Sequence, residues 1–198
     1  MLKIAYFRGT LPQGGECCRA TAPGGIRRPE RLVWRWLLRQ LLAEAGCPDG
    51  LSYLAVSPGG RPYLPGIPLD FSPTHTAGFV AVALTDAGAV GLDAETKKGR
   101  DISRLMRAAD RWFTPDECAR VRAALDENPA DGERAFLRVW TAKEALVKRT
   151  GAGLAGMRSA DSAAPRDCIL RTAEIGETVL TVAAPDGAEM PEFRELFF

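Results

Sequence analysis

The sequence predicts an α+β fold, in which short strands and amphipathic helices occupy separate blocks of the chain. Residues 78–84 and 89–95 have the length and apolar content of strands, with a turn between them. Residues 29–45 carry apolar side chains at helical spacing, with Pro29 suited to the first turn and Gly46 to the stop. Helical patterns return at 102–112 and 133–149.

The N-terminal elements are predicted from the apolar period and from the glycines and prolines that interrupt it. The strand at 89–95 is expected to be the second strand of a hairpin. Before it we expect an edge strand at 2–7, a loop at 10–25, the helix at 29–45, a strand at 51–57 closed by a turn at 58–60, an irregular proline-rich stretch at 61–68, and a strand from 69 that breaks at 72–75 before a buried strand or helix start ending at 84.

The C-terminal elements begin with a helix at 102–112, which has an apolar side and a basic stripe assigned to Arg100, Arg104, Arg107 and Arg111. Thr114, Pro115 and Glu117 form the cap, first-turn proline and capping box that open a second helix. The rest is expected to be a loop at 126–131, a long helix at 133–149 stopped by glycines at 151 and 153, and strands at 168–173 and 177–183.

Size and composition restrict the class of protein. A chain of 198 residues can form one large domain or two small ones. A net charge of +1 gives no general reason to expect nucleic acid or membrane as a partner. No apolar stretch approaches the roughly 20 residues of a spanning helix, and the start lacks the pattern of a signal peptide. Five cysteines without zinc-like pairing favour a reducing cytoplasm, where we expect a monomer.

Two acidic clusters carry the strongest chemical signal. Asp93 and Glu95 alternate on a predicted strand, so both side chains leave the same face. Glu144 and Lys148 lie one turn apart on the same side of a predicted helix. Each cluster alone is an ordinary solvated rim or helix pair. If they converge, they suit a divalent cation, since Mg²⁺ commonly binds one or two protein carboxylates together with phosphate oxygens.

Several motifs in one order then resemble those of the 4′-phosphopantetheinyl transferases, and more narrowly of the surfactin-synthetase-activating type. The resemblance covers residues 60–154. It rests on Gly60-Arg61-Pro62-Tyr63, Phe71-Ser72-Pro73-Thr74-His75, Gly91-x-Asp93-x-Glu95, the stretch 112–117, and Phe136-x-x-x-Trp140-x-x-Lys143-Glu144-Ala145-x-x-Lys148 followed by Gly151-x-Gly153-Leu154.

The resemblance implies a pseudodimer of two similar α+β halves, each an antiparallel sheet packed with helices. From the sequence alone no clean repeat is visible, although both halves place a helix before strands. Residues 1–86 would form the N-terminal half, which binds coenzyme A. Residues 87–198 would form the C-terminal half, with the magnesium site and the carrier-protein docking surface.

The implied reaction transfers the 4′-phosphopantetheine arm of coenzyme A, the substrate, to a serine hydroxyl of an apo acyl or peptidyl carrier protein, releasing 3′,5′-ADP. Mg²⁺, or alternatively Mn²⁺, would bridge the pyrophosphate. By resemblance the metal ligands are Asp93, Glu95 and Glu144, and the catalytic residues are Glu144 as general base with Asp93 and Lys148. Coenzyme A would be bound by Arg35, Arg61, Thr74, His75, Lys143 and Lys148.

Two substitutions within the motifs and one site that the motifs leave open affect these assignments. Thr74 replaces the family's serine and keeps the hydroxyl, whereas Arg61 replaces a lysine and changes its geometry. The residues for the 3′-phosphate are not fixed by the motifs. Arg35 matches by its place in the first helix, and Arg31 and the pair at 27–28 are further candidates.

The basic side of the 102–112 helix has two interpretations. It is either a solvated face or a docking surface for an acidic carrier, with Arg104 and Arg107 supplying charge and Leu105 or Met106 the contact. Two alternative functions also remain at this stage. One is a catalytically silent homologue that binds coenzyme A or a carrier protein, and the other is a magnesium-dependent hydrolase using the same carboxylates.

Overall fold

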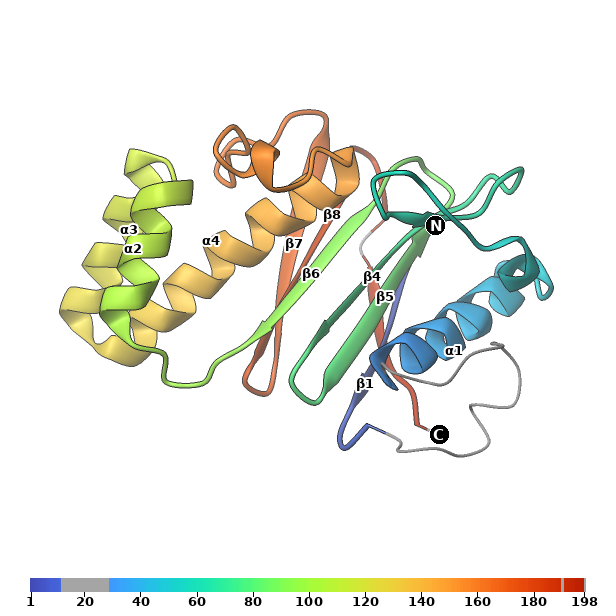
Figure 1. Cartoon of the computed structure of the whole chain (residues 1–198), viewed down its shortest axis with the longest axis horizontal. Coiled ribbons are helices and arrows are strands. Elements are labelled where there is room, and N and C mark those ends of the chain that lie inside the picture. The colour runs from blue at the N-terminus through green and yellow to red at the C-terminus, as the bar shows by residue number, and fades with distance from the viewer. Residues whose placement is uncertain (12–28, 190, 198) are drawn as a thin grey trace.

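The computed structural model describes residues 1–11, 29–189 and 191–197, and it confirms the predicted α+β class (Figure 1). Most of the predicted loop at 10–25, with Cys17 and Cys18, and the arginine pair at 27–28 lie outside these residues. The described elements are β1 (Leu2–Arg8), α1 (Pro29–Glu44), η2 (Gly50–Tyr53), β2 (Ala55–Val56), β3 (Pro62–Tyr63), β4 (Asp70–Thr76), β5 (Phe79–Thr85), β6 (Gly91–Thr96), α2 (Ile102–Trp112), α3 (Pro115–Glu127), α4 (Pro129–Thr150), η3 (Leu154–Met157), β7 (Cys168–Ile175), β8 (Thr178–Pro185) and β9 (Glu192–Glu195).

The first sheet has the strand order β4-β5-β1-β9, and α1 covers one of its faces (Figure 1). Leu37, Leu38 and Leu41 of α1 are fully buried against this face together with Val80 and Val82 of β5. The opposite face of β5 is buried against the second sheet. The strand β1 is therefore interior and not the predicted edge strand, because β9 pairs with it in parallel.

The second sheet has the order β6-β8-β7 and is antiparallel. The long helix α4 lies across it, and α2 and α3 pack against the N-terminal part of α4 (Figure 1). Thr141 of α4 and Thr181 of β8 share a buried hydroxyl hydrogen bond of 2.8 Å. The predicted cap of α3 is confirmed, with Thr114 and Glu117 forming both bonds of a capping box.

The two sheets meet along β4 and β6, which lie side by side (Figure 1). Backbone N–H groups of β6 donate to side-chain hydroxyls of β4 instead of to its backbone. The pairs are Leu92 N to Ser72 Oγ at 3.0 Å, Ala94 N to Thr74 Oγ1 at 3.2 Å and Thr96 N to Thr76 Oγ1 at 3.4 Å.

This junction corrects two predictions. The chain does not break at 72–75, because Pro73 is accommodated within β4 while its neighbours continue the pairing with β5. Nor is β6 the hairpin partner of β5: that partner is β4, and β6 pairs with β8. The polar residues that suggested a break are the ones that join the sheets.

Other boundaries differ less. Of the strand predicted at 51–57, only residues 55–56 form a strand, and residues 51–53 belong to the 3₁₀ helix η2. The loop predicted at 126–131 is reduced to Asn128, which ends α3 and caps α4, so α4 begins four residues earlier than expected. Arg100 precedes α2 and does not belong to the helix stripe. The division at residue 86 and the pseudodimer stay predictions, and β9 returns the chain to the first sheet.

Among the described residues, no helix combines the length and the apolar character needed to cross a membrane.

Candidate active site

The junction between β6 and α4 brings the two acidic clusters together. Gly91 begins β6 directly beneath α4, and a Cβ built there would lie 1.9 Å from the carbonyl oxygen of Ala145. Only glycine therefore allows α4 to approach so closely. The approach brings Lys148 to the Asp93 side of β6 and sets Glu144 one turn earlier on the same helix.

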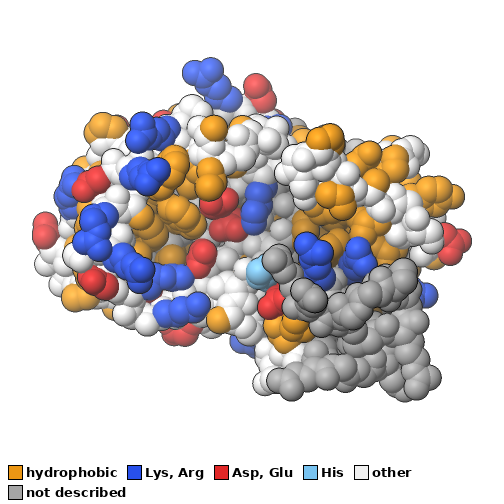
Figure 2. All heavy atoms as spheres, viewed as in Figure 1, with side chains coloured by type: hydrophobic (Ala, Val, Ile, Leu, Met, Phe, Trp, Pro, Cys, Tyr) orange, Lys and Arg blue, Asp and Glu red, His pale blue; other side chains and the backbone are white. Residues whose placement is uncertain are grey.

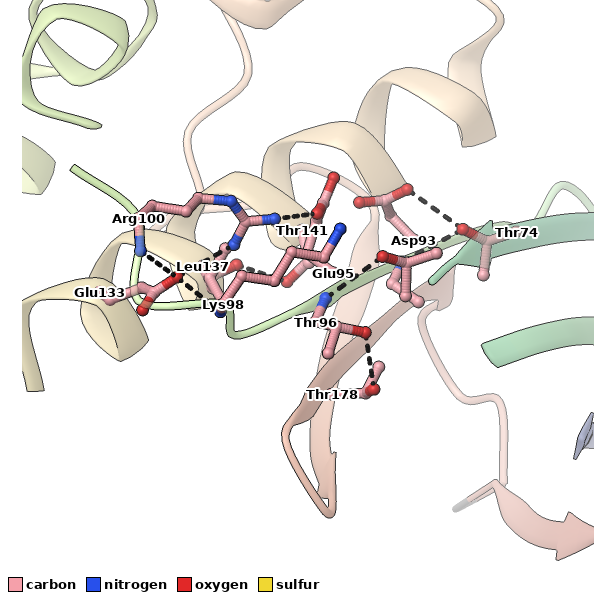
Figure 3. A network of polar contacts seen from close by, with 12 residues as sticks. Thr74, Asp93, Glu95, Thr96, Lys98, Arg100, Glu133, Leu137, Thr141 and Thr178 are labelled. Atoms are coloured by element: carbon pink, nitrogen blue, oxygen red, sulfur yellow. Dashed lines mark hydrogen bonds and ion pairs between the residues drawn. The ribbon is translucent and has the colours of Figure 1, made fainter. Parts of the chain in front are cut away.

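Lys148 forms the main link across the site. Its Nζ lies 2.6 Å from Asp93 Oδ1 and 3.0 Å from the backbone oxygen of Leu92. It also donates to Thr74 Oγ1 at 3.4 Å. The Thr74 hydroxyl in turn donates to Asp93 Oδ1 at 3.3 Å (Figure 3). Residues from β4, β6 and α4 are thus joined at one point.

The Asp93 carboxylate is buried, and one of its oxygens is satisfied while the other is not. Burial raises the pKa of Asp93, although the Lys148 ammonium and the Thr74 hydroxyl act in the opposite direction. Asp93 Oδ2 is buried and has no hydrogen-bond partner among the described residues. Buried carboxylate oxygens are normally paired or bound to a metal, so this orphan oxygen fits a cation ligand.

Glu95 follows Asp93 on the same face but turns toward an arginine. Arg100 Nη2 lies 2.7 Å from Glu95 Oε2, while Arg100 Nη1 lies 3.2 Å from Glu133 Oε1 (Figure 3). Burial raises the pKa of Glu95, and the Asp93 charge adds to the rise, while Arg100 opposes it. The two strand carboxylates are therefore close enough to repel each other.

Glu144 is electrostatically coupled to both strand carboxylates. Burial raises its pKa, the charges of Asp93 and Glu95 raise it further, and Lys148 lowers it. The described side chains nevertheless include no ready cluster of three metal-binding groups. The donor set of carboxylate oxygens, with one buried oxygen unpaired, suits a hard divalent cation, but Lys148 and Arg100 occupy the other ends of two of these groups.

A cleft of about 610 Å³ opens between α1 and the β4–β6 junction. Figure 2 shows acidic and basic side chains gathered around the hollow between the two parts of the molecule. The cleft collects most of the predicted coenzyme A and metal residues. Its lining includes Arg31, Arg35, Thr74, His75, Asp93, Glu95 and Lys148.

Glu144 lines a neighbouring cavity of about 340 Å³. Lys148 lines both cavities and separates them, together with residues of the turn and strand at 60–62. Gly151, in the left-handed conformation with φ of 72°, ends α4 at the rim of the smaller cavity. The predicted general base and the predicted phosphate ligands therefore face adjoining spaces.

Two predicted coenzyme A ligands lie outside the large cleft. Lys143 does not line the cleft, since its side chain is 0 % exposed and its Nζ lies 2.9 Å from Glu117 Oε2, so its role as a ligand stays a prediction that this burial disfavours. Its position on α4 faces α3 and not the cleft. Arg61 lines the smaller cavity, where it donates to the oxygens of Arg149 at 3.0 Å and Val90 at 3.1 Å and pairs with Asp70 at 2.5 Å.

The predicted docking residues lie beside a third hollow. A groove of about 410 Å³ between α2 and α4 is lined by Arg100, Arg104, Leu105 and Trp140, and also by Glu95. Figure 2 shows basic side chains around an apolar hollow over these helices. Leu105 is buried in the groove wall, and Met106 packs half-buried against the same helical core. Arg107 is exposed and donates to Ser103 Oγ at 3.1 Å.

Sequence reasoning missed the link through Arg100 and the roles of Trp34 and Glu30 in the cleft wall. Arg100 was assigned to a helical stripe that in fact starts after it. Arg100 follows Glu95 by five residues, beyond the end of the strand, and this sequence separation does not predict a contact. Trp34 was visible only as an apolar helix position, although it stacks on Phe71 at 6.1 Å between centroids.

Comparison with known proteins identifies the family of the chain. Residues 89–179, which include β6 and α4, match the family model of the 4′-phosphopantetheinyl transferase superfamily. Over 178 residues the chain is 33% identical to a 4′-phosphopantetheinyl transferase, AcpT, of Salmonella typhimurium, covering 89% of this chain and 85% of that protein. The chain therefore belongs to the 4′-phosphopantetheinyl transferase superfamily, a family of transferase enzymes.

Other relatives span most of the chain as well. A 4′-phosphopantetheinyl transferase of Bacillus subtilis is 29% identical over 188 residues, covering 83% of this chain and 80% of the relative. The AcpT protein of Escherichia coli K12 is 33% identical over 153 residues, or 77% of this chain and 71% of that protein. The predicted superfamily is thus confirmed, while the surfactin-synthetase-activating subtype stays a prediction.

Proposed function

We propose that this chain transfers the 4′-phosphopantetheine arm of coenzyme A to a serine hydroxyl of an apo acyl or peptidyl carrier protein and releases 3′,5′-ADP. The observation that carries the proposal is the 610 Å³ cleft, which is lined by Arg35 of α1 and His75 of β4 together with Asp93 of β6 and Lys148 of α4. Cationic and carboxylate groups lining one cleft suit a metal-bound polyphosphate.

In the proposed reaction the serine oxygen forms a bond to the phosphorus that carries the pantetheine arm. The bond from that phosphorus to the bridging oxygen breaks, and 3′,5′-ADP leaves with the electron pair. Glu144 accepts the serine proton, and its raised pKa makes it a better base than an ordinary exposed glutamate. Lys148 and His75 balance phosphate charge, since phosphoryl transfer depends mainly on positioning and charge neutralisation.

Asp93, Glu95 and Glu144 would hold a divalent cation, Mg²⁺ or Mn²⁺. When bound, the cation would act as a Lewis acid on the pyrophosphate oxygens. The unpaired Asp93 Oδ2 supports this assignment. In the structure Lys148 bonds Asp93 Oδ1 and Arg100 bonds Glu95 Oε2, so these two side chains balance part of the negative charge of the carboxylates.

The groove between α2 and α4 is the proposed docking surface for the carrier protein. Its apolar floor and the charges of Arg104 and Arg107 suit a helix with an acidic face. Replacing both arginines by glutamate should raise the KM for the carrier at least about tenfold and leave the KM for coenzyme A unchanged. Equal effects on both substrates would exclude docking at this groove.

The transfer is tested by intact-protein mass spectrometry of an apo carrier incubated with the chain, coenzyme A and Mg²⁺. One phosphopantetheine arm should be added, and chelation of the metal should prevent it. Glu144→Gln and Asp93→Asn should lower turnover by at least about 100-fold with the circular dichroism spectrum retained. No mass gain with any of several carriers, despite coenzyme A binding, would favour the silent homologue.

A further inference from the structure

Arg100 occupies a position between two carboxylates that belong to different parts of the molecule. Its Nη1 lies 3.2 Å from Glu133 Oε1, and its Nη2 lies 2.7 Å from Glu95 Oε2 (Figure 3). Glu133 belongs to α4 and is 4% exposed, whereas Glu95 belongs to β6 and is 30% exposed. One guanidinium thus connects a structural carboxylate with a proposed metal ligand.

Glu133 holds the Arg100 segment firmly in place. Its Oε1 accepts the backbone N–H groups of Lys98 at 3.1 Å and Arg100 at 3.3 Å, and its Oε2 accepts that of Gly99 at 3.0 Å. Charge-assisted hydrogen bonds of this kind are among the stronger ones. The backbone at Arg100 is therefore fixed by Glu133. The contact between the guanidinium and Glu95 is the one that a partner could replace.

Glu95 is the residue shared by the two hollows that the proposed reaction would use. It lines the 610 Å³ cleft together with Asp93 and Lys148, and it lines the 410 Å³ groove together with Arg100. An acidic group of a partner in the groove would be attracted by Arg100 and repelled by Glu95, since both side chains line it. A new anion beside Arg100 competes with Glu95 for the same guanidinium donors.

We propose that Arg100 is a positioning residue that couples the groove to the metal site: it withholds Glu95 from a divalent cation until an acidic partner in the groove draws the guanidinium away. The inference rests on the proposed function. It gives a physical reason why the described carboxylates do not form a ready three-ligand cluster. Because binding energies are reciprocal, a partner that frees Glu95 must itself bind better when the metal is present.

The test measures binding of Mn²⁺ alone to the full chain by calorimetry, without coenzyme A or carrier. Arg100→Gln should bind Mn²⁺ about tenfold more tightly than the wild type, a typical size for a residue acting through a ligand. Arg104→Gln is the matched control. It removes one positive charge from the same groove, but the ion pairs with Glu95 and Glu133 are made by Arg100 and not by Arg104. An affinity of Arg100→Gln equal to that of Arg104→Gln overturns the inference.

A second variant covers the case in which Arg100→Gln does not fold. Arg100→Lys keeps the charge, but a single ammonium cannot span Glu95 and Glu133 in the way that a guanidinium fork does. Its Mn²⁺ affinity should lie above that of the wild type, and an unchanged value counts against the coupling. Failure of every protein to bind Mn²⁺ overturns the metal site itself, whereas binding without an Arg100 effect overturns only this inference.

The partner half of the inference uses a carrier protein whose acceptor serine is changed to alanine. This carrier should raise the Mn²⁺ affinity of the wild type by about fivefold or more, the lower range of ordinary site-to-site coupling. It should not raise the affinity of Arg100→Gln, in which Glu95 is already free. The same increase in both proteins would show that the carrier acts by another route.

Discussion

The buried pair of Lys143 and Glu117 provides a demanding test, because the two side chains are 0% exposed and 2.9 Å apart. Glu117 also accepts bonds from Thr114 N at 2.8 Å and from Ser162 N at 2.9 Å and Oγ at 2.6 Å. Lys143→Met would leave the carboxylate with these donors but without a counter-charge. Breaking a buried pair in this way costs about 3–5 kcal/mol, and the remaining bonds favour the lower end.

A loss of about 3 kcal/mol lowers the melting temperature of a chain of this size by about 10 °C. Thermal unfolding followed by circular dichroism measures it. Lys97→Met is the matched control, since its partner Glu177 is 66% exposed and such pairs contribute little. Adding Glu117→Gln to Lys143→Met should restore part of the stability by removing the buried charge.

The same variant separates a structural lysine from a coenzyme A ligand. Well below its melting temperature, Lys143→Met should keep the KM for coenzyme A of the wild type, because α4 turns this side chain away from the cleft. A melting temperature equal to that of the wild type would refute the electrostatic reasoning. A large rise in the KM for coenzyme A at full stability would return Lys143 to the binding site.

Three further outcomes are expected. Gly91→Ala should destabilise the chain by at least about 2 kcal/mol in urea unfolding and lower turnover, because the new methyl group meets the Ala145 carbonyl and displaces α4; wild-type values would contradict this packing. Burial favours a raised pKa for Glu117, but hydrogen bonds from Ser162, Thr114 and Lys143 lower the pKa overall. The stability that Glu117 contributes is therefore fully present above the unfolded pKa of about 4.3, and it is lost as the pH falls through the folded pKa. Glu117→Gln should therefore flatten the acid limb of a stability–pH curve, and an unchanged limb would exclude the assignment. Arg61→Gln should lower the melting temperature and leave the affinity for coenzyme A nearly unchanged, since Arg61 bonds the end of α4. An unchanged melting temperature with a clear loss of coenzyme A affinity would make Arg61 a phosphate ligand.

The helices and their caps could be predicted from sequence because local chemistry determines them. Pro29 begins α1, Thr114 and Glu117 cap α3, and Gly151 ends α4 in the structure as in the prediction. Each of these signals acts within a few residues of the chain. The strand pairing was less predictable, since β6 pairs with β8 across about half of the sequence, and no local turn records that choice.

The site residues show the same division. The alternation of Asp93 and Glu95 on β6 is local and was predicted with its common face. Whether Lys143 or Lys148 faces the cleft depends on how α4 is rotated against β6, which the close contact at Gly91 determines. Arg100 lies before the first turn of α2, so helical periodicity wrongly placed it with the basic residues of that helix.

Thr74 shows how one hydroxyl can hold both the fold and the site. Its Oγ1 accepts the N–H of Ala94, accepts a bond from Lys148 Nζ and donates to Asp93 Oδ1. A hydroxyl has one donor and two acceptor positions, so these three contacts use all of them. The hydroxyl is what this place requires, and serine or threonine supplies it equally. The segment read as a chain break is polar because β4 uses one face to join the second sheet, and this junction places the Asp93–Lys148 pair at the wall of the cleft.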